Sequence, residues 1–483
     1  METIIKALEV GVSSVGWHIV LWDFIFVSLL LIIGTILRSK IKLFQRWLIP
    51  NAILAGTIGL LLSNNVLGRL TNGLVYIPFS ENMVSYPYHL LNLCFCSIPL
   101  SAVEISWKEF RHRGISTGLC ISFTQAMQAA FGVGLALIFI VLGFKLSPLI
   151  GALFMFGYGT GPGQALAIGN VYENLGLFMG GGEIGLAFGS FGYFFAFLGG
   201  VPLLIWGMKN RLTVEEHSLD DLPDYVRTGI IKDDKDRKTA GRFVSSPEAI
   251  DTLSLQIALV FTVYAISFLI YVLLIIFLPE NVSIYLNGFL YMICTMTGIL
   301  FRVILEKTGK TYLIDSQTQN RIQGVLTDFI IVIAISAISI PIVWMYFTPF
   351  MTIAILGGFF TLFLSVWLHK RIFTDYYFER LMMNYGTHTG TAMTGLVLMR
   401  VVDPDFRSPA PFNYTMGMPL ALIVQFVIAL LGGFIIYINP FSLWTGVLYF
   451  IILVVMCIII WSVWPALGLW KKYKPFWKLW PKD

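Results

Sequence analysis

YGTGPGQA at residues 158–165 and YGTHTGTA at residues 385–392 are two short breaks in otherwise apolar sequence. Five of the eight positions are identical, and the two motifs lie 227 residues apart. Irregular backbone at membrane depth is tolerated only where it is buried in protein or lines a water-filled cavity. A matched pair of such breaks in two halves of a chain is typical of the binding site of a secondary transporter.

The composition indicates a polytopic membrane protein. Hydrophobic residues make up 57% of the 483 residues and charged residues only 12%, whereas a soluble domain carries about 25% charged residues. The mean hydropathy is +0.80. The net charge of +5 is too small to indicate a nucleic-acid partner, so the bilayer is the expected surroundings. All five cysteines lie in apolar segments and are expected to be small buried residues, with no metal or cofactor framework.

Eleven segments are long and apolar enough to be predicted as spans, because a helix needs about 20 apolar residues to cross the hydrocarbon. The long segment at 115–143 is expected to be tilted or broken near Gly132 and Gly134. The predicted spans are 20–37, 47–64, 86–105, 115–143, 183–207, 252–277, 284–303, 323–346, 350–368, 413–437 and 441–464.

The basic residues of short loops predict the orientation, because Lys and Arg concentrate on the cytoplasmic side. Basic loops and nearly uncharged loops fall on opposite sides of the membrane only if segments 147–170 and 383–400 do not cross it. Each of these segments must then enter and leave on the same side. We therefore predict two re-entrant hairpins, the first dipping in from outside and the second from the cytoplasm. The N-terminus is then outside and the C-terminus cytoplasmic.

An internal repeat is expected from features that recur at similar offsets. Asp23 and Asp251 each begin a predicted span, 228 residues apart, and Leu-Gly-Gly recurs at 198–200 and 431–433. Five crossings per half is an odd number, so the second half would be inverted. The expected fold is all-α, with two inverted five-helix repeats, a re-entrant hairpin in each, and an extra C-terminal helix. The expected segments are an N-terminal stretch (1–19), a first repeat (20–207), a cytoplasmic linker (208–250), a second repeat (251–437), and an extra span with a basic tail (438–483).

The hairpin tips are the predicted site for a small anionic solute and for Na⁺. Each arm of about ten residues covers roughly 15 Å, which is half a bilayer. Free amide groups at a half-helix N-terminus attract anions, while carbonyl and threonine oxygens suit Na⁺. His388 is expected either to carry a proton or hold a carboxylate, or to be a neutral, hydrogen-bonded residue. The alternative is that the glycines only permit close helix packing. The predicted substrate-binding residues are Tyr158, Gly159, Thr160, Gly161, Gln164, Tyr385, Gly386, Thr387, His388, Thr389 and Thr391.

Six residues are candidates for binding the coupling ion. Two of them are acids in or beside predicted spans, where ionisable groups are functional hypotheses by default. For Glu183 the alternative is a favourable interaction with a helix N-terminus, and for Asp328 it is pairing with a loop cation. For the two glutamines the alternative is hydrogen bonding between helices. The candidates are Thr160, Thr387, Glu183, Asp328, Gln125 and Gln128.

Several motifs give the chain a family resemblance over about residues 20–437. It resembles the bacterial sodium/glutamate symporters, which are related in fold to the 2-hydroxycarboxylate transporters. The sequence differs from the family in Tyr158, His388, Pro162 and the eleventh span. The motifs that carry the resemblance are Arg46-Trp47-Leu48-Ile49-Pro50, Ala55-Gly56, Gly157-Tyr158-Gly159-Thr160-Gly161, Glu183, Phe191-Gly192, Gly199-Gly200-Val201-Pro202, residues 385–392 and Pro419.

The resemblance implies Na⁺-coupled uptake of glutamate or a similar small carboxylate. It also implies a homodimer in the bacterial cytoplasmic membrane, working by an elevator motion. A proton-coupled transporter of another organic anion is the alternative. A channel and a membrane-embedded enzyme are the remaining alternatives, and the six histidines are scattered along the sequence rather than grouped as in a catalytic site.

Overall fold

The computed structural model describes residues 17–101, 113–214, 223–237, 239–373, 375–404, 407–467 and 479–480. Parts of several predicted segments lie outside these residues. They are the N-terminal stretch up to residue 16, the basic loop 102–112, the linker at 215–222, and most of the basic tail.

The described chain is built from helices, with one isolated bridge between Ser63 and Ile77. The first set runs α2 (Trp17–Lys40), α3 (Lys42–Arg46), α4 (Asn51–Leu62), α5 (Tyr86–Ser101), α7 (Ile115–Val141), α8 (Leu149–Thr160), α9 (Pro162–Asn174) and α10 (Gly181–Lys209). The linker carries α11 (Asp224–Thr228). The second set runs α12 (Thr252–Phe277), α13 (Glu280–Gly288), α14 (Leu290–Lys307), α15 (Ser316–Ser336), α16 (Ile340–Met345), α17 (Phe347–Ile372), α18 (Tyr377–His388), α19 (Ala392–Val402), α20 (Ala410–Ile438) and α21 (Leu443–Ala466).

Seven helices in the described part of the chain are long and apolar enough to cross a membrane. They are Ile19–Lys40 of α2, α7, α10, α12, α17, α20 and α21, and each coincides with a predicted span. Of the other four predicted spans, 47–64 and 86–105 contain the short helices α4 and α5. The predicted span 284–303 is divided between α13 and α14, and 323–346 is divided between α15 and α16. The prediction of a multi-pass, all-helical protein is therefore confirmed, whereas the number of eleven crossings stays a prediction.

Some sequence-based expectations were wrong in detail. Helix α7 is not broken near Gly132, so of the two expectations for it the tilt stays a prediction. Gly132 lets α7 approach α8, because a Cβ added there would lie 2.3 Å from the Gly151 oxygen. The segment 323–346 is not one helix, since α15 ends at Ser336. Asp23 does not begin a helix but lies buried within α2, where it accepts hydrogen bonds from the Ser80 amide (3.0 Å) and the Tyr86 hydroxyl (2.9 Å). Of these two aspartates, Asp251 does cap its helix, accepting from the Ser254 amide at 2.7 Å.

Both glycine- and threonine-rich motifs break a helix into two half-length helices. In the first motif, α8 ends at Thr160, Gly161 has φ +90°, and α9 begins at Pro162. Proline suits that position because the first helical residue needs no amide hydrogen and the ring fixes φ near its helical value. In the second motif, α18 ends at His388, residues 389–391 are non-helical, and α19 begins at Ala392. We call α8–α9 hairpin 1 and α18–α19 hairpin 2. Their depth in a membrane, and hence their re-entrant character, stays a prediction.

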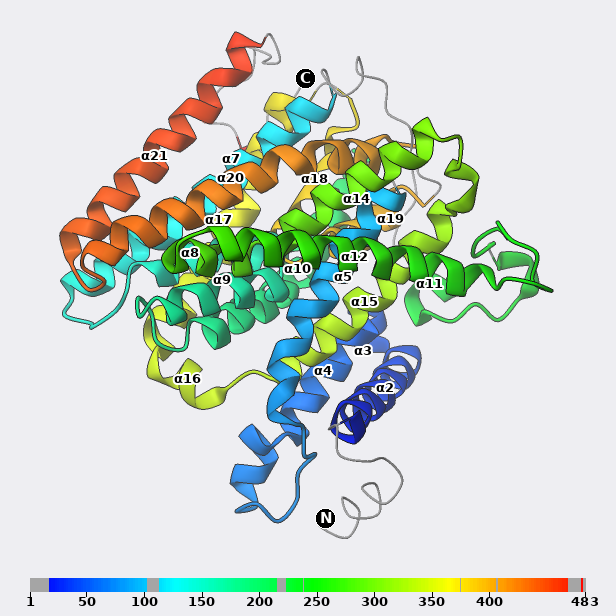
Figure 1. The fold of residues 1–483 in the computed structure, drawn as a ribbon, viewed down its shortest axis with the longest axis horizontal. Helices are drawn as coiled ribbons and strands as arrows, with labels where there is room; N and C mark the ends of the chain where they lie inside the picture. Colours follow the sequence, from blue (N-terminus) through cyan, green and yellow to red (C-terminus); the bar gives the residue numbers. More distant parts are fainter. Residues whose placement is uncertain are drawn as a thin grey trace.

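Packing contacts divide the long helices into two groups, and α2 and α21 lie at opposite edges of the molecule (Figure 1). The first group comprises α2, α4, α5, α12, α14 and α15, with α5 packed along α15 at its centre. The second comprises both hairpins with α7, α10, α17, α20 and α21. Helix α21 lies on the outer edge of this second group, where it packs on α7 and α20. In each half of the chain, the first three predicted spans belong to the first group, and the fourth span, the hairpin and the fifth span belong to the second.

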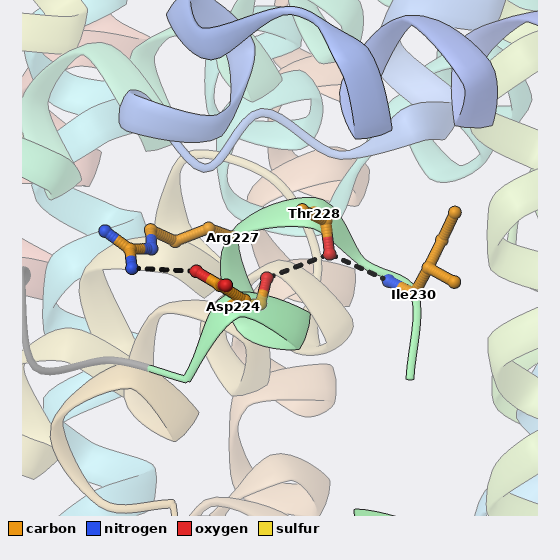
Figure 2. Close-up of polar contacts among 4 residues, drawn as sticks. All are labelled: Asp224, Arg227, Thr228 and Ile230. Atoms are coloured by element: carbon orange, nitrogen blue, oxygen red, sulfur yellow. Dashed lines mark hydrogen bonds and ion pairs between the residues drawn. The ribbon is translucent and has the colours of Figure 1, made fainter. Parts of the chain in front are cut away.

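The described part of the linker is held by local bonds and by hydrogen bonds to several helices. Within α11, Arg227 pairs with Asp224 at 3.0 Å, and the Thr228 hydroxyl bonds the Asp224 oxygen at 2.8 Å and accepts from the Ile230 amide at 3.3 Å (Figure 2). The Arg38 guanidinium of α2 donates to the Val226 oxygen at 3.2 Å. This part of the linker is thus attached to the first helix group, while the Val214 amide near the linker's start donates to Glu379 of α18 at 2.8 Å.

Candidate functional site

The two hairpin tips contact one another. A Cβ added to Gly161 would lie 2.7 Å from the Thr391 Cγ2 atom and 3.3 Å from the Gly390 oxygen. On the other side of hairpin 2, a Cβ added to Gly192 of α10 would lie 2.7 Å from the Thr389 oxygen. Side chains are excluded at these two glycines, so the backbones of the tips and of α10 approach closely. The two tips, which are 227 residues apart in the sequence, are therefore adjacent in the structure.

Two glutamines of α7 bind the ends of both first arms. Gln125 Nε2 donates to the Gly159 oxygen of hairpin 1 at 3.3 Å, and Gln128 Nε2 donates to the His388 oxygen of hairpin 2 at 2.9 Å. These carbonyl groups lie at the C-terminal ends of helices, where no amide of the same helix can donate to them. Gln425 of α20 in turn donates to Gln125 Oε1 at 3.2 Å, whereas Gln128 Oε1 is buried without a partner in the described structure. The side-chain NH₂ groups of both glutamines therefore hold the tips in place. Of their two side-chain oxygens, only Gln128 Oε1 is without a partner in the described structure.

The two motif tyrosines are buried anchors. The Tyr158 hydroxyl donates to the Ala354 oxygen of α17, and the Tyr385 hydroxyl donates to the Phe195 oxygen of α10, both at 2.8 Å. Both side chains are fully buried. Each hairpin is thereby fastened to a helix from the other half of the chain. Neither tyrosine lies among the described residues that line the cavity between the hairpins.

A cavity of about 150 Å³ lies where the tips face the first helix group. Helices α5 and α15 form one wall, and the two tips with α20 form the other. None of the described residues that line it is charged. Its polar lining consists of Ser101, Thr160, Asn320, Gln323, Thr327, Thr387, Thr391, Tyr414 and Thr415.

The second arms of both hairpins begin at this cavity. Gly161, Pro162 and Gly163 at the start of α9 line it, as do Thr391, Ala392 and Met393 at the start of α19. The first amides of a helix have no intrahelical acceptor, and the helix dipole makes that end positive. Pro162 has no N–H and the Gly161 amide bonds the Gly157 oxygen, so the cavity-lining amides left are those of Gly163 in α9 and of Ala392 and Met393 in α19. The two helix N-termini therefore bring amides and partial positive charge to one small polar space, which is suited to an anion.

Of the two candidate acids, Asp328 lies nearer the tips. It has no hydrogen bond or ion pair within the described residues, and it interacts electrostatically with the Tyr193 hydroxyl of α10. That hydroxyl is buried near Thr391 and makes no well-formed hydrogen bond. Glu183 lies in the first turn of the same helix, ten residues from Tyr193 and so about 15 Å along its axis. The structure does not bring Glu183 to the tips.

The threonine hydroxyls keep lone pairs free for a cation. Thr160, Thr387 and Thr389 each donate to the carbonyl four residues earlier, at 2.5, 2.8 and 2.7 Å. A hydroxyl that donates in this way still has acceptor capacity on its oxygen. Thr160 and Thr387 line the cavity, whereas Thr389 is fully buried beside it.

His388 belongs to a buried polar cluster beneath hairpin 2. Its Nδ1 lies 2.6 Å from the Asn384 oxygen and its Nε2 lies 3.4 Å from the Ile121 oxygen. The Asn384 side chain contacts His369 Nε2 at 2.8 Å, and Cys120 Sγ lies 3.8 Å from the same nitrogen. His369 and His388 are therefore linked through Asn384. His388 itself does not line the cavity.

The predicted site residues divide into two sets. Gly159, Thr160, Gly161, Thr387 and Thr391 line the cavity. The others support it: Tyr158, Tyr385, His388 and Thr389 through hydrogen bonds, and Gly386 by close contact with Gly395. Gln164 is fully buried and has no partner for either amide atom in the described structure. Sequence reasoning missed Tyr193, Gln323, Asn384, Tyr414 and Gln425. Their only signal was a polar group inside an apolar span.

Comparison with known proteins gave one match. The family model described as sodium/glutamate symporter matches residues 20–407, which include both hairpins. No curated protein and no solved structure matches the chain.

Proposed function

The chain belongs to the sodium/glutamate symporter family, and on that premise we propose that it carries glutamate or a similar small carboxylate through the cavity between its hairpins, coupled to Na⁺. Family membership implies a multi-pass membrane transporter rather than an enzyme, with Na⁺ as the coupling ion. The observation that carries the site assignment is the convergence of two half-length helix N-termini, α9 and α19, on one polar cavity.

The substrate carboxylate binds to the N–H groups at the starts of α9 and α19. No charged side chain lines the described cavity, so backbone amides and hydroxyls take the place of an arginine. Gln323, Asn320 and Tyr414 supply amide and hydroxyl groups for the remaining polar atoms of the substrate. Half-helix N-termini facing an anionic substrate group are a recurring arrangement in secondary transporters.

Sodium binds beside the substrate, between the tips and α15. The hydroxyls of Thr387 and Thr391 line the cavity there, the Tyr193 hydroxyl lies near Thr391, and the Asp328 carboxylate interacts electrostatically with Tyr193. Oxygen ligands of this kind suit a hard cation. The described cavity lining carries no charged residue, so Asp328, outside the lining, would be the source of negative charge for the ion.

Transport proceeds by movement of the second helix group against the first. The cavity lies on the boundary between the groups, with walls from both. Its rim residues Ser101, Asn320 and Pro411 lie toward the ends of α5, α15 and α20 that adjoin predicted cytoplasmic loops. This position of the cavity supports an inward-facing state of an elevator-type cycle. The homodimer expected from the resemblance is part of this proposal and is testable by mass measurement in detergent.

A proton is the second candidate for the coupling ion, and His388 favours it. Both ring nitrogens of this histidine face backbone oxygens, at 2.6 and 3.4 Å. A doubly protonated imidazolium donates to both oxygens, whereas a neutral ring donates to only one. A proton-coupled carrier of another organic anion would use this residue beneath hairpin 2.

Uptake by purified protein in liposomes tests both candidates. We expect radiolabelled glutamate to accumulate when an inward Na⁺ gradient is imposed, and not when choline replaces Na⁺. Unlabelled small dicarboxylates serve as competitors to define the substrate. Uptake driven equally well by a pH gradient without Na⁺ would transfer the coupling role to the proton, and no accumulation of any carboxylate would contradict the transport assignment.

A further inference from the structure

A second and larger cavity, about 850 Å³, lies away from the hairpin tips. It is formed by residues 240–243 of the linker together with α5, α12 and α15. Its walls are apolar, with Leu93, Ile257, Phe261, Ile322, Val325 and Leu326 among the lining residues. We call it the linker groove. A cavity of this volume can hold a molecule much larger than an amino acid.

The end of the linker is fixed over this groove by specific bonds. Asp315 caps α15 by accepting from the Thr318 amide at 2.8 Å, and it also accepts from the Arg242 amide at 3.2 Å. Burial alone would raise the pKa of this carboxyl group, but the hydrogen bonds from Thr318 and Arg242 outweigh burial, so the pKa of Asp315 lies below its ordinary value and the group is ionised at neutral pH. Ser245 and Thr252 share a hydroxyl hydrogen bond of 2.7 Å at the start of α12. The linker segment is therefore held against the first turns of two helices.

Two arginines stand at the mouth of the groove without counter-ions. Arg242 and Arg321 both line it and are exposed, and neither guanidinium has a hydrogen-bond or ion-pair partner in the part of the chain that the structure describes. The third charged residue in the lining, Asp251, uses its carboxylate to cap α12. Two positive charges and one negative charge leave the mouth with a net charge of +1.

We propose that the linker groove binds one anionic phospholipid, with its phosphate between Arg242 and Arg321 and an acyl chain along the apolar walls. Guanidinium groups bind phosphate oxygens through paired, charge-assisted hydrogen bonds. Basic sites between helices at the cytoplasmic surface of a membrane are suited to anionic lipid headgroups. The linker and the loop before α15 are both predicted to lie on that side, so the arginines would be at headgroup level.

A lipid fits this groove better than a peptide. Leu253, Phe261 and Val325 in its lining are more than half exposed, so the apolar wall continues onto the outer, bilayer-facing surface of α12 and α15. An acyl chain has no polar groups to satisfy there, whereas a peptide backbone would leave N–H and C=O groups unpaired in hydrocarbon. The charge at one end and the apolar walls at the other match the two parts of a phospholipid.

Helix α15 separates this groove from the substrate cavity. Ile322 and Val325 line the groove, while Gln323 and Thr327 line the cavity. A bound lipid would therefore pack on the helix that forms one wall of the proposed transport site. The lipid site itself depends only on the groove and its arginines, and its test needs no transport activity.

Native mass spectrometry of the full-length protein provides the test. The probes are phosphatidylglycerol, phosphatidylcholine with the same acyl chains, and glycerophosphoglycerol, which has the headgroup without the chains. Arg242→Gln, Arg321→Gln and the double variant are compared with Arg69→Gln/Lys310→Gln, which removes two exposed positive charges outside the groove. Thermal unfolding of each variant shows that it is folded.

We expect one phosphatidylglycerol to bind to the wild type more tightly than phosphatidylcholine does, and glycerophosphoglycerol to bind only weakly. Each arginine variant should bind phosphatidylglycerol about fivefold more weakly, and the double variant about 25-fold. The control pair should bind like the wild type. Equal binding of the two lipids, or unchanged binding by the double variant, would overturn the proposal.

Discussion

Gln128 of α7 donates a hydrogen bond of 2.9 Å to the backbone oxygen of His388, the last residue of the first arm of hairpin 2. Three residues earlier on the same helix, Gln125 binds the Gly159 oxygen of hairpin 1 at 3.3 Å. One helix thus satisfies the carbonyl ends of both hairpins, and it sets their spacing. The N-terminal ends of the second arms are left free to face the cavity.

Replacing Gln128 by leucine should loosen hairpin 2. The His388 oxygen and the Thr361 hydroxyl, which Gln128 also contacts at 2.9 Å, would lose their partner in a buried position. An unsatisfied buried polar group costs about 1–3 kcal/mol, so we expect a lower free energy of unfolding and slower Na⁺-driven uptake. Gln45→Leu is the matched control, because its amide bonds the Ser39 oxygen outside the hairpins. Wild-type stability and uptake in Gln128→Leu would contradict the role assigned to this glutamine.

Gly161→Ala should impair transport for two separable reasons. The residue has φ +90° and ψ 171°, a conformation essentially restricted to glycine that costs other residues about 1–3 kcal/mol, and the new Cβ would lie 2.7 Å from Thr391 Cγ2. Gly143 has φ +93° but nothing within 4 Å of a Cβ, so Gly143→Ala introduces a positive φ without a steric contact. We expect Gly161→Ala to reduce the uptake rate far more than Gly143→Ala does.

A second substitution tests the contact itself. Thr391→Ser removes Cγ2 and keeps the hydroxyl, so Gly161→Ala/Thr391→Ser should recover much of the uptake. If uptake by the double variant is as slow as that of Gly161→Ala, contact between the two tips does not explain the loss of uptake.

The breaks in the two hairpins could be predicted from local sequence, and the contacts around them could not. Glycine, proline and threonine within apolar segments identify non-helical backbone, and both breaks fall inside the predicted motifs. By contrast, Gln425 binds Gln125 from 300 residues away, and Tyr193 reaches the tips from a helix with no polar pattern. A single polar residue in an apolar span gives no sign of its partner.

Helix boundaries near the first group were the least predictable. An apolar run indicates that a segment is buried, but not where a helix ends. The run 323–346 continues through a turn, so that α15 ends at Ser336 and α16 begins at Ile340. Asp23 looked like a helix start, yet its buried carboxylate binds Ser80 and Tyr86, 57 and 63 residues later in the chain. Such long-range partners outweigh local signals.

The motif tyrosines should prove structural when their hydroxyls are removed. Tyr158→Phe and Tyr385→Phe each delete a buried donor to a backbone oxygen at 2.8 Å. We expect a loss of about 1–3 kcal/mol in the free energy of unfolding and an unchanged KM for the substrate. Tyr312→Phe, at an exposed position, is the control. A large rise in KM without a loss of stability would instead place the tyrosine in contact with substrate.

Asp328→Asn should weaken the dependence of uptake on Na⁺. The variant removes the one carboxylate that interacts with the Tyr193 hydroxyl near the tips. A lost charge-assisted contact corresponds to about a tenfold or larger rise in the Na⁺ concentration for half-maximal uptake. Glu183→Gln should change that concentration little, since Glu183 lies ten residues along α10 from Tyr193. The reverse ranking of the two variants would assign the ion to Glu183.

Trp480→Ala should loosen the start of hairpin 2. The Trp480 ring lies 5.4 Å from Lys370 Nζ, and its centroid is 5.6 Å from that of Tyr377, the first residue of α18, and 5.5 Å from that of Trp206. A cation–π contact contributes about 0.5–2 kcal/mol, and the aromatic contacts add to it. Hydrogen exchange should therefore become faster across residues 377–383 while the tips keep their protection. Trp444→Ala, at a position that is 81% exposed, is the matched control. If exchange in the first arm is unchanged in Trp480→Ala, the contact of the C-terminal segment does not stabilise the hairpin.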